Sequence, residues 1–476
     1  MYKKYVFHLV YLLPILCLAA GGDHSGGAHL DGSIENMSIV WVIPFAGILL
    51  SIAIFPLVLP DFWHHNFGKI SLFWATILIV PFLIKEGISV TLYELLHVGL
   101  LEYVPFIILL LALFTISGGV RLTGALVGTP IVNLTIIAIG TLLASWMGTT
   151  GAAMLLIRPL INANKHRKNK VHIIVFFIFL VANIGGSLTP LGDPPLFLGF
   201  LKGVSFFWTT SAMLLPMIIM VVALLIIFYF FDSYYVKKEN FKIDTSGEKV
   251  KLGVEGVFNL GLILGVIGAV LISGFWKPHI SFEVYHGVHL ELQNITRDIL
   301  LLGLAYASWT YTPQQIRIDN EYTWFPIIEV AKLFAGIFIT IIPAIAILKA
   351  GTNGALAFII SSVSNDSGPI NMMYFWYTGI LSSFLDNAPT YLVFFNTAGG
   401  DPVTLMSELK NTLLAISAGA VFMGANTYIG NAPNFMVKSI SESSGIEMPS
   451  FFGYFFKWAV PILMPLFIIV SWLFFG

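Results

Sequence analysis

The chain has 476 residues, of which 57% are hydrophobic and 10% are charged, and its formal net charge is -1. Ordinary soluble domains carry about 25% charged residues, so this composition excludes that class and indicates a polytopic membrane protein. The near-zero net charge gives no basis for a nucleic-acid partner. Cys17 is the single cysteine, which excludes a disulfide framework and a thiolate metal cluster.

The N-terminal residues are expected to be a targeting segment and a polar tail. Residues 1–20 place Lys3 and Lys4 before an apolar run that ends in small residues, which is typical of a secretory signal peptide. An uncleaved first helix is the alternative. Residues 21–37 are polar and glycine-rich and indicate a solvated tail, and residues 38–100 are expected to form N-terminal helices.

Apolar segments long enough to cross a bilayer, some of them only when tilted, follow along the chain. They are expected at 38–60, 70–84, 101–120, 205–231, 256–275, 297–311, 324–348 and 453–475. Between the second and third, residues 85–103 alternate at helical spacing and predict an interfacial helix. The basic run 162–172 and the charged linker 232–255 are both expected to face the cytoplasm, by the positive-inside rule.

Residues 183–197 interrupt an otherwise apolar stretch. They contain three glycines, three prolines and Asp193, a composition that no continuous helix tolerates. A transmembrane helix over 171–203 is therefore expected to break here. Hydrocarbon cannot satisfy free backbone N–H and C=O groups, so unwound backbone at membrane depth must line a protein cavity. We expect Asp193 to lie in that cavity.

The same pattern of glycine, threonine, proline and phenylalanine recurs 238 residues later and predicts a second broken helix over 411–440. This shift carries Gly186, Thr189, Gly192, Pro195 and Phe197 onto residues of the same type, namely Gly424, Thr427, Gly430, Pro433 and Phe435. Paired interruptions in two halves of a chain are the sequence sign of a secondary transporter built from repeats, with its site where the repeats meet.

A second pair of interruptions obeys the same shift. Residues 128–162 are interrupted at Gly148-Thr149-Thr150, and residues 371–398 are interrupted at Asp386-Asn387-Ala388. Each segment is expected to form a re-entrant hairpin whose polar tip lies at mid-depth.

The loop at 399–410 lacks the basic signature of its counterpart, which indicates that the two halves are inverted in the membrane. The expected fold is an all-α polytopic membrane protein with two inverted repeats, each with a re-entrant hairpin and a broken transmembrane helix. The expected divisions are repeat 1 at 101–231, a cytoplasmic linker at 232–255, connecting helices at 256–323 and repeat 2 at 324–476.

At these motifs the chain resembles the ion transporter superfamily, which includes NhaD-type sodium/proton antiporters, citrate transporters and divalent anion/sodium symporters. The motifs that carry the resemblance are residues 146–159, 183–195, 383–390 and 424–434. Residues 384–390 look most like the NhaD and citrate-transporter branch. The resemblance implies hairpin tips and broken-helix loops that bind sodium and substrate, in a homodimer that moves a transport domain against a scaffold.

Asp193 and Asp386 are the first site candidates, because an ionisable side chain at mid-depth is costly and usually functional. If each tip pairs with the broken helix of its own half, each aspartate has its own sodium site, built from oxygen ligands. The other candidate ligands are Thr149, Thr150, Asn183, Ser187 and Thr189 in the first half and Asn387, Asn426, Thr427 and Asn431 in the second. The alternatives are that the aspartates cap half-helices and that the break residues only form turns.

The first functional reading is a sodium (or lithium)/proton antiporter of a bacterial inner membrane, working by alternating access, because a carboxylate holds a proton or a cation but seldom both. The alternative is a cation-coupled symporter of citrate or another carboxylate. Two mid-depth acids and the departure from the Ser-Asn-Thr tips of the anion symporters disfavour it. Arg158 is expected to snorkel, with a role toward a substrate carboxylate as the alternative.

No enzyme is expected, since the sequence has no His-Glu-x-x-His, Gly-x-Ser-x-Gly or phosphate-cradling motif. We expect no cofactor beyond the transported sodium or lithium ion and proton. The expected partners are membrane lipid, small ions and a second copy of the chain.

Overall fold

The computed structural model describes residues 37–124, 126–239 and 253–476. Most of these residues are helical, and the short strands among them form three two-stranded antiparallel sheets. Seven helical runs in the described residues are long and apolar enough to cross a membrane: Ile39–Val58, Pro60–Ser117, Pro130–Met147, Phe206–Glu239, Phe258–Phe275, Phe325–Lys349 and Phe451–Phe475. The all-α polytopic class is thus confirmed. The expected signal peptide and nearly all of the expected polar tail lie outside the described residues.

The N-terminal helices differ from expectation in where they break. They are α2 (Ile43–Val58), α3 (Pro60–Val98) and α4 (Val104–Ser117), with a π-helical turn at Gly99–Tyr103. Gly87 kinks α3 with a φ of 81°, a left-handed value that favours glycine. From this kink the helix continues into α4, so the expected interfacial helix at 85–103 is not a separate element.

The first half contains a helical hairpin and a broken helix where the sequence predicts them. The elements are α5 (Pro130–Met147), α6 (Thr149–Ala163), α7 (Val171–Leu180), a 3₁₀ turn at Ile184–Ser187 and α8 (Pro194–Leu201). Gly148, with a φ of 80°, forms the tip between α5 and α6. The Thr149 N–H donates to the carbonyl of Gly192 at 2.9 Å, which fixes this tip against the break of the same half.

The second half repeats this order. Its elements are α16 (Asn371–Phe384), α17 (Asn387–Thr397), α18 (Pro402–Met406), α19 (Lys410–Met423), a 3₁₀ turn at Gly424–Asn426 and α20 (Ala432–Ser443). The chain ends with α21 (Phe451–Tyr454), a π-helical turn at Phe455–Ala459 and α22 (Val460–Phe475).

The remaining elements connect and cover the two halves. The helices are α9 (Phe206–Glu239), α10 (Phe258–Phe275), α11 (Leu292–Tyr311), α12 (Gln314–Asp319), α13 (Phe325–Thr340), α14 (Ile342–Lys349) and α15 (Ala357–Val363). The strand pairs are β1 (Arg121–Thr123) with β2 (Gly253–Glu255), β3 (Ser281–Tyr285) with β4 (Val288–Glu291), and β5 (Ser364–Asn365) with β6 (Gly368–Pro369). The start of the linker, expected at residue 232, is helical because α9 continues to Glu239, with Lys237 and Lys238 favourably placed near its C-terminal dipole.

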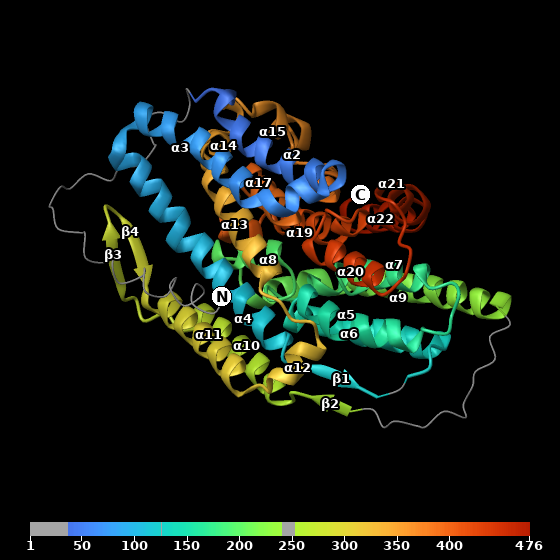
Figure 1. Cartoon of the computed structure of the whole chain (residues 1–476). Helices are drawn as coiled ribbons and strands as arrows, with labels where there is room; N and C mark the ends of the chain where they lie inside the picture. The colour runs from blue at the N-terminus through green and yellow to red at the C-terminus, as the bar shows by residue number, and fades with distance from the viewer. Residues whose placement is uncertain (1–36, 125, 240–252) are drawn as a thin grey trace.

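The two halves interlock at the centre of the molecule (Figure 1). α8 of the first half contacts α17 of the second, and α20 of the second half contacts α6 of the first. The first arms of both broken helices are buried almost all round, from His172 to Leu180 in α7 and from Thr412 to Met423 in α19. A helix that is apolar on every side belongs inside a bundle, so these arms form the core that carries the breaks.

Contacts between hairpin and break repeat with the 238-residue shift. Thr189 Oγ1 donates to the Ser145 carbonyl, and Thr427 Oγ1 donates to the Ser383 carbonyl. The hydroxyls of these two serines in turn donate to the carbonyls at 185 and 423. The two halves therefore share the same hydrogen bonds between hairpin and break. Their inverted orientation in the membrane stays a prediction.

Each break also folds back on itself through a pair of glycines. A Cβ atom added to Gly192 would lie 2.1 Å from the carbonyl oxygen of Gly186, and one added to Gly430 would lie 2.5 Å from that of Gly424. Such distances are far below van der Waals contact, so both approaches require a residue without a side chain.

We expect Gly192→Ala and Gly430→Ala to destabilise the protein by about 1–3 kcal/mol, because the facing backbone cannot move away freely. The measurement is the unfolding temperature of purified protein in detergent. Gly261→Ala in α10 is the matched control, since nothing lies within 4 Å of its added Cβ. An unfolding temperature of Gly192→Ala equal to that of the control would contradict the close approach.

Candidate functional site

Asp193 is the N-cap residue of α8 and is 1% exposed. An N-cap aspartate usually accepts hydrogen bonds from the first N–H groups of its helix. Pro194 and Pro195 follow, however, and proline has no N–H. The side chain of Asp193 makes no capping bond, so its carboxylate is left to other donors.

Three neutral side chains donate to this carboxylate, and all three are buried. Thr149 Oγ1 lies 3.2 Å and Asn431 Nδ2 2.9 Å from Oδ1, while Asn387 Nδ2 lies 2.6 Å from Oδ2. These donors come from the first hairpin tip, the second break and the second hairpin tip respectively. Asp193 is thus the point where both tips and both breaks meet.

The repeat explains this convergence. Asn431 follows Asp193 by 238 residues, and Asn387 follows Thr149 by the same shift. Asn431 is likewise the N-cap residue of its half-helix, α20, and it also donates to the Ala182 carbonyl at 3.1 Å. Equivalent positions therefore face each other, one with a carboxylate and one with an amide. A second carboxylate there would place two like charges in contact, which proteins avoid.

Asp386 occupies a different environment. It is half-buried at the N-cap of α17, where its Oδ1 accepts from the Ala388 N–H at 3.0 Å. Asn387 and Asn431, expected beside Asp386, contact Asp193 instead. The physical reason is local: the residues after Asp386 have N–H groups to cap, whereas Asp193 precedes two prolines. The structure thus brings Thr149, Asn387 and Asn431 to Asp193, so the second-half amides are not grouped around Asp386.

The other candidate residues fasten the breaks. Asn183 Nδ2 donates to the Ile178 carbonyl and to Asn434 Oδ1, each at 2.7 Å. Ser187 Oγ donates to the Ile184 carbonyl at 2.8 Å, inside its own turn. Asn426 Nδ2 donates to Ser383 Oγ at 2.8 Å, beside the Thr427 bond described above. These contacts match the turn-forming alternative, although they also place the residues around the junction.

Asn434 is a junction residue that sequence reasoning missed. It accepts from Asn183 across the halves and donates to the carbonyls of Gly424 and Thr427, each at 2.9 Å. The available signal was its place one helical turn after Asn431, on the same face of α20.

Three buried amide oxygens among the candidate residues, Oδ1 of Asn183, Asn387 and Asn426, have no hydrogen-bond partner in the described part of the chain. Buried acceptors are normally satisfied, so such oxygens call for an explanation. Asn387 is the most informative because its nitrogen binds Asp193 while its oxygen is unpaired. Neutral oxygens beside a carboxylate are the ligands that hard alkali cations prefer.

A cavity of about 100 Å³ lies beside Asp193. Its walls are the first tip, the first break and the helices α4, α8, α13 and α20, and Thr150 is one of its lining residues. Asp193 is the one ionisable side chain among the described residues that line it. Arg158 lies elsewhere: its Nη2 pairs with Glu321 Oε2 at 2.8 Å, and Glu321 is 71% exposed. Arg158, the alternative candidate for a substrate carboxylate, therefore does not line this cavity.

The capping role of Asp386 predicts a specific pattern of stability. Asp386→Ala should destabilise the protein by about 0.5–2 kcal/mol, because an N-cap is lost, while Asp386→Asn should cost little, because asparagine caps equally well. Unfolding temperatures of the two variants in detergent check this. Equal losses in both variants would show that the charge, and not the cap, matters for folding.

Comparison with known proteins places the chain in a family. No curated protein matches it. The family model described as "Putative citrate transport" matches residues 34–475, which is almost the whole chain. This match agrees with the resemblance carried by the hairpin and break motifs, and it covers every residue of the junction around Asp193. The chain therefore belongs to the citrate transport family of membrane transporters.

Proposed function

We propose that this transporter exchanges sodium or lithium for protons and that Asp193 is the group that carries them. One observation supports this most strongly: a single buried carboxylate, held by neutral donors only, faces the junction of both tips and both breaks. The neighbouring cavity has no second ionisable side chain among its described lining residues.

The charge of this site explains how exchange would work. A buried carboxylate without a cationic partner is costly, so it takes up a proton or a cation. Either one neutralises it, and binding both would leave an unpaired positive charge at the same depth. The Thr149 hydroxyl and the unpaired Asn387 oxygen would supply neutral ligands when a cation replaces the proton. Occupancy by one therefore excludes the other, which is the condition for antiport.

The remaining candidates take supporting parts in this proposal. Thr150 lines the cavity, and Asn431 orients the carboxylate from the opposite half. Asn183, Ser187, Thr189, Asn426 and Thr427 hold the unwound segments at the depth of the ion. Asp386 keeps α17 in place as its cap. A homodimer in a bacterial inner membrane is the proposed assembly and location.

A cation-coupled carboxylate symporter is the second candidate, and the description of the family favours it. A citrate ion in the described cavity would bring its negative charges beside Asp193, without a cationic side chain in the lining to offset them. Several cations would have to enter with it. We therefore place antiport first.

Purified protein in proteoliposomes tests the proposal. Sodium, lithium, potassium and citrate gradients are imposed in parallel, and internal pH is followed with a fluorescent dye. Asp193→Asn preserves the size of the side chain but removes its charge, so we expect a loss of sodium-driven proton movement of roughly a hundredfold or more. Asp386→Asn, which keeps its cap, is the matched control and should retain most of the activity.

Two outcomes would contradict the proposal. One is unchanged antiport in Asp193→Asn at normal expression. The other is sodium-dependent citrate uptake by the wild type without proton counterflow, which would establish the symporter.

A further inference from the structure

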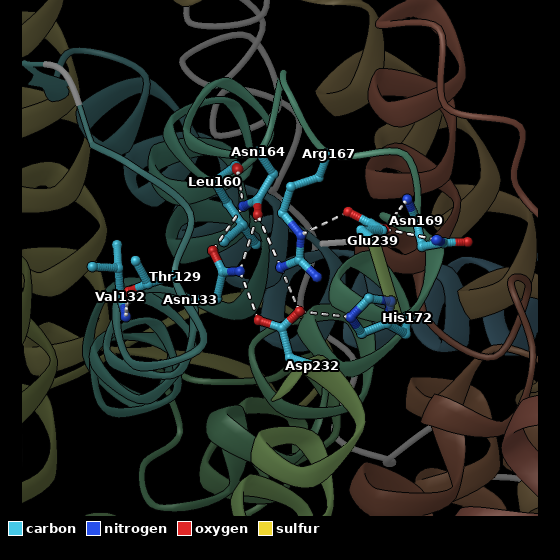
Figure 2. A network of polar contacts seen from close by, with 10 residues as sticks. All are labelled: Thr129, Val132, Asn133, Leu160, Asn164, Arg167, Asn169, His172, Asp232 and Glu239. Atoms are coloured by element: carbon cyan, nitrogen blue, oxygen red, sulfur yellow. Dashed lines mark hydrogen bonds and ion pairs between the residues drawn. The ribbon is translucent and has the colours of Figure 1, made fainter. Parts of the chain in front are cut away.

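The base of the first hairpin contains a buried polar cluster that the transport site does not use (Figure 2). We call it the hairpin-base cluster, and it consists of Asn133, Asn164, Arg167, His172 and Asp232. None of these residues is more than 3% exposed. They come from α5, from the end of α6, from the basic run, from α7 and from α9, so the cluster joins all the elements that surround the hairpin base.

Asp232 is the centre of the hairpin-base cluster. Its Oδ1 lies 2.5 Å from Arg167 Nη1 and 2.8 Å from His172 Nε2, and its Oδ2 accepts from Asn133 Nδ2 at 2.9 Å. The side chains of Arg167 and Asp232 are fully buried. This ion pair joins the basic run to α9, and the His172 contact joins α7 to α9.

The two asparagines join the ends of the hairpin to each other. Asn133 Nδ2 donates to Asn164 Oδ1 at 3.0 Å, and Asn164 Nδ2 donates back to Asn133 Oδ1 at 2.7 Å. Around them, Glu239 lies 3.8 Å from Arg167 Nε and accepts two bonds of 2.7 Å from Asn169. The start of α5 and the end of α6 are thereby held in one position relative to α9.

The second half solves the same packing problem without charges. The 238-residue shift carries Arg167 onto Leu405 and Asp232 onto Val470, and both of these apolar residues are fully buried. Burying an ion pair costs desolvation energy, and an apolar replacement is often as stable. The architecture therefore does not require an ion pair at this place.

The counterpart of the asparagine pair is also simpler. Asn133 corresponds to Asn371, whose Oδ1 accepts a single bond, of 2.7 Å, from Thr412 Oγ1. Trp376 Nε1 of the second hairpin also donates to Ser471 Oγ of α22 at 3.0 Å. The base of the first hairpin is thus held by charged, directional bonds, and the second hairpin by neutral bonds and apolar contacts. Directional charged bonds fix one geometry, whereas apolar surfaces can slide past each other.

We propose that Arg167 and Asp232 are positioning residues for the ion site. Two elements connect the hairpin-base cluster to that site. The first hairpin carries Thr149 at its tip, and α7 leads into the break that precedes Asp193. Because the cluster holds the base of the hairpin against α7, it keeps Thr149 in contact with Asp193 as the surrounding helices move. This inference rests on the proposed function, because it assigns the lock to the transported ion.

The double variant Arg167→Leu/Asp232→Val tests the lock, since it gives the first half the residues of the second. The variant should fold, with a moderately lower unfolding temperature than the wild type, because the buried His172 Nε2 loses its partner on Asp232. We expect its KM for sodium to rise roughly tenfold to a hundredfold with a smaller change in maximal rate, because a loosened tip misplaces a ligand. Hydrogen exchange of residues 147–151 should become faster.

Thr412→Val is the matched control, because it removes a neutral bond of the second hairpin and should change neither sodium KM nor exchange at 147–151. If the double variant does not fold, Arg167→Lys takes its place, since lysine keeps the charge but loses the guanidinium fork. A folded variant with wild-type KM and wild-type exchange at the tip overturns the proposal. If the wild type transports no sodium, the proposed function fails, and tip exchange alone decides whether the lock exists.

Discussion

Pro194 and Pro195 occupy the first two positions of α8 and have no N–H group to offer the side chain of Asp193. The N–H of the next residue, Leu196, donates to the backbone carbonyl of Asp193 at 3.1 Å. The carboxylate is buried and still has to find donors. It finds them in Thr149, Asn387 and Asn431, which belong to both halves of the chain. One carboxylate that makes no bond to its own helix therefore joins the two halves of the chain. Because all three donors are neutral, they do not offset the negative charge of Asp193, and under the proposed function a proton or a cation would do so.

The elements of the fold follow closely from the sequence because their signals are local. Glycine and proline mark both breaks and the first tip, and the apolar runs between them have the length of membrane spans. The α9 boundary was misplaced for a similar local reason, since Lys237 and Lys238 suggest a loop but suit a helix C-terminus. Residues 85–103 look like a surface helix until the kink at Gly87 is known.

The site could be predicted only in part. The sequence singles out Asp193 as a candidate and names the hydroxyl and amide side chains that contact it. Pairing each tip with its own half, however, assigns Asn387 and Asn431 to Asp386. Contacts across the halves join residues 194 and 238 positions apart, and no local pattern reports them. The capping of Asp386 was readable, since the next residues retain their N–H groups. Asp232 is another residue that local patterns misassign. In the sequence it looks like the first residue of a charged linker, whereas α9 places it beside Arg167.

The central claim is that sodium and a proton compete for Asp193. The most direct test adds sodium to purified protein in weakly buffered detergent solution and measures the protons released. Because the ligand must lose its proton to bind the cation, the account predicts release of about one proton per bound ion in the wild type, and no release in Asp193→Asn. Saturable sodium binding by the wild type without proton release would contradict it.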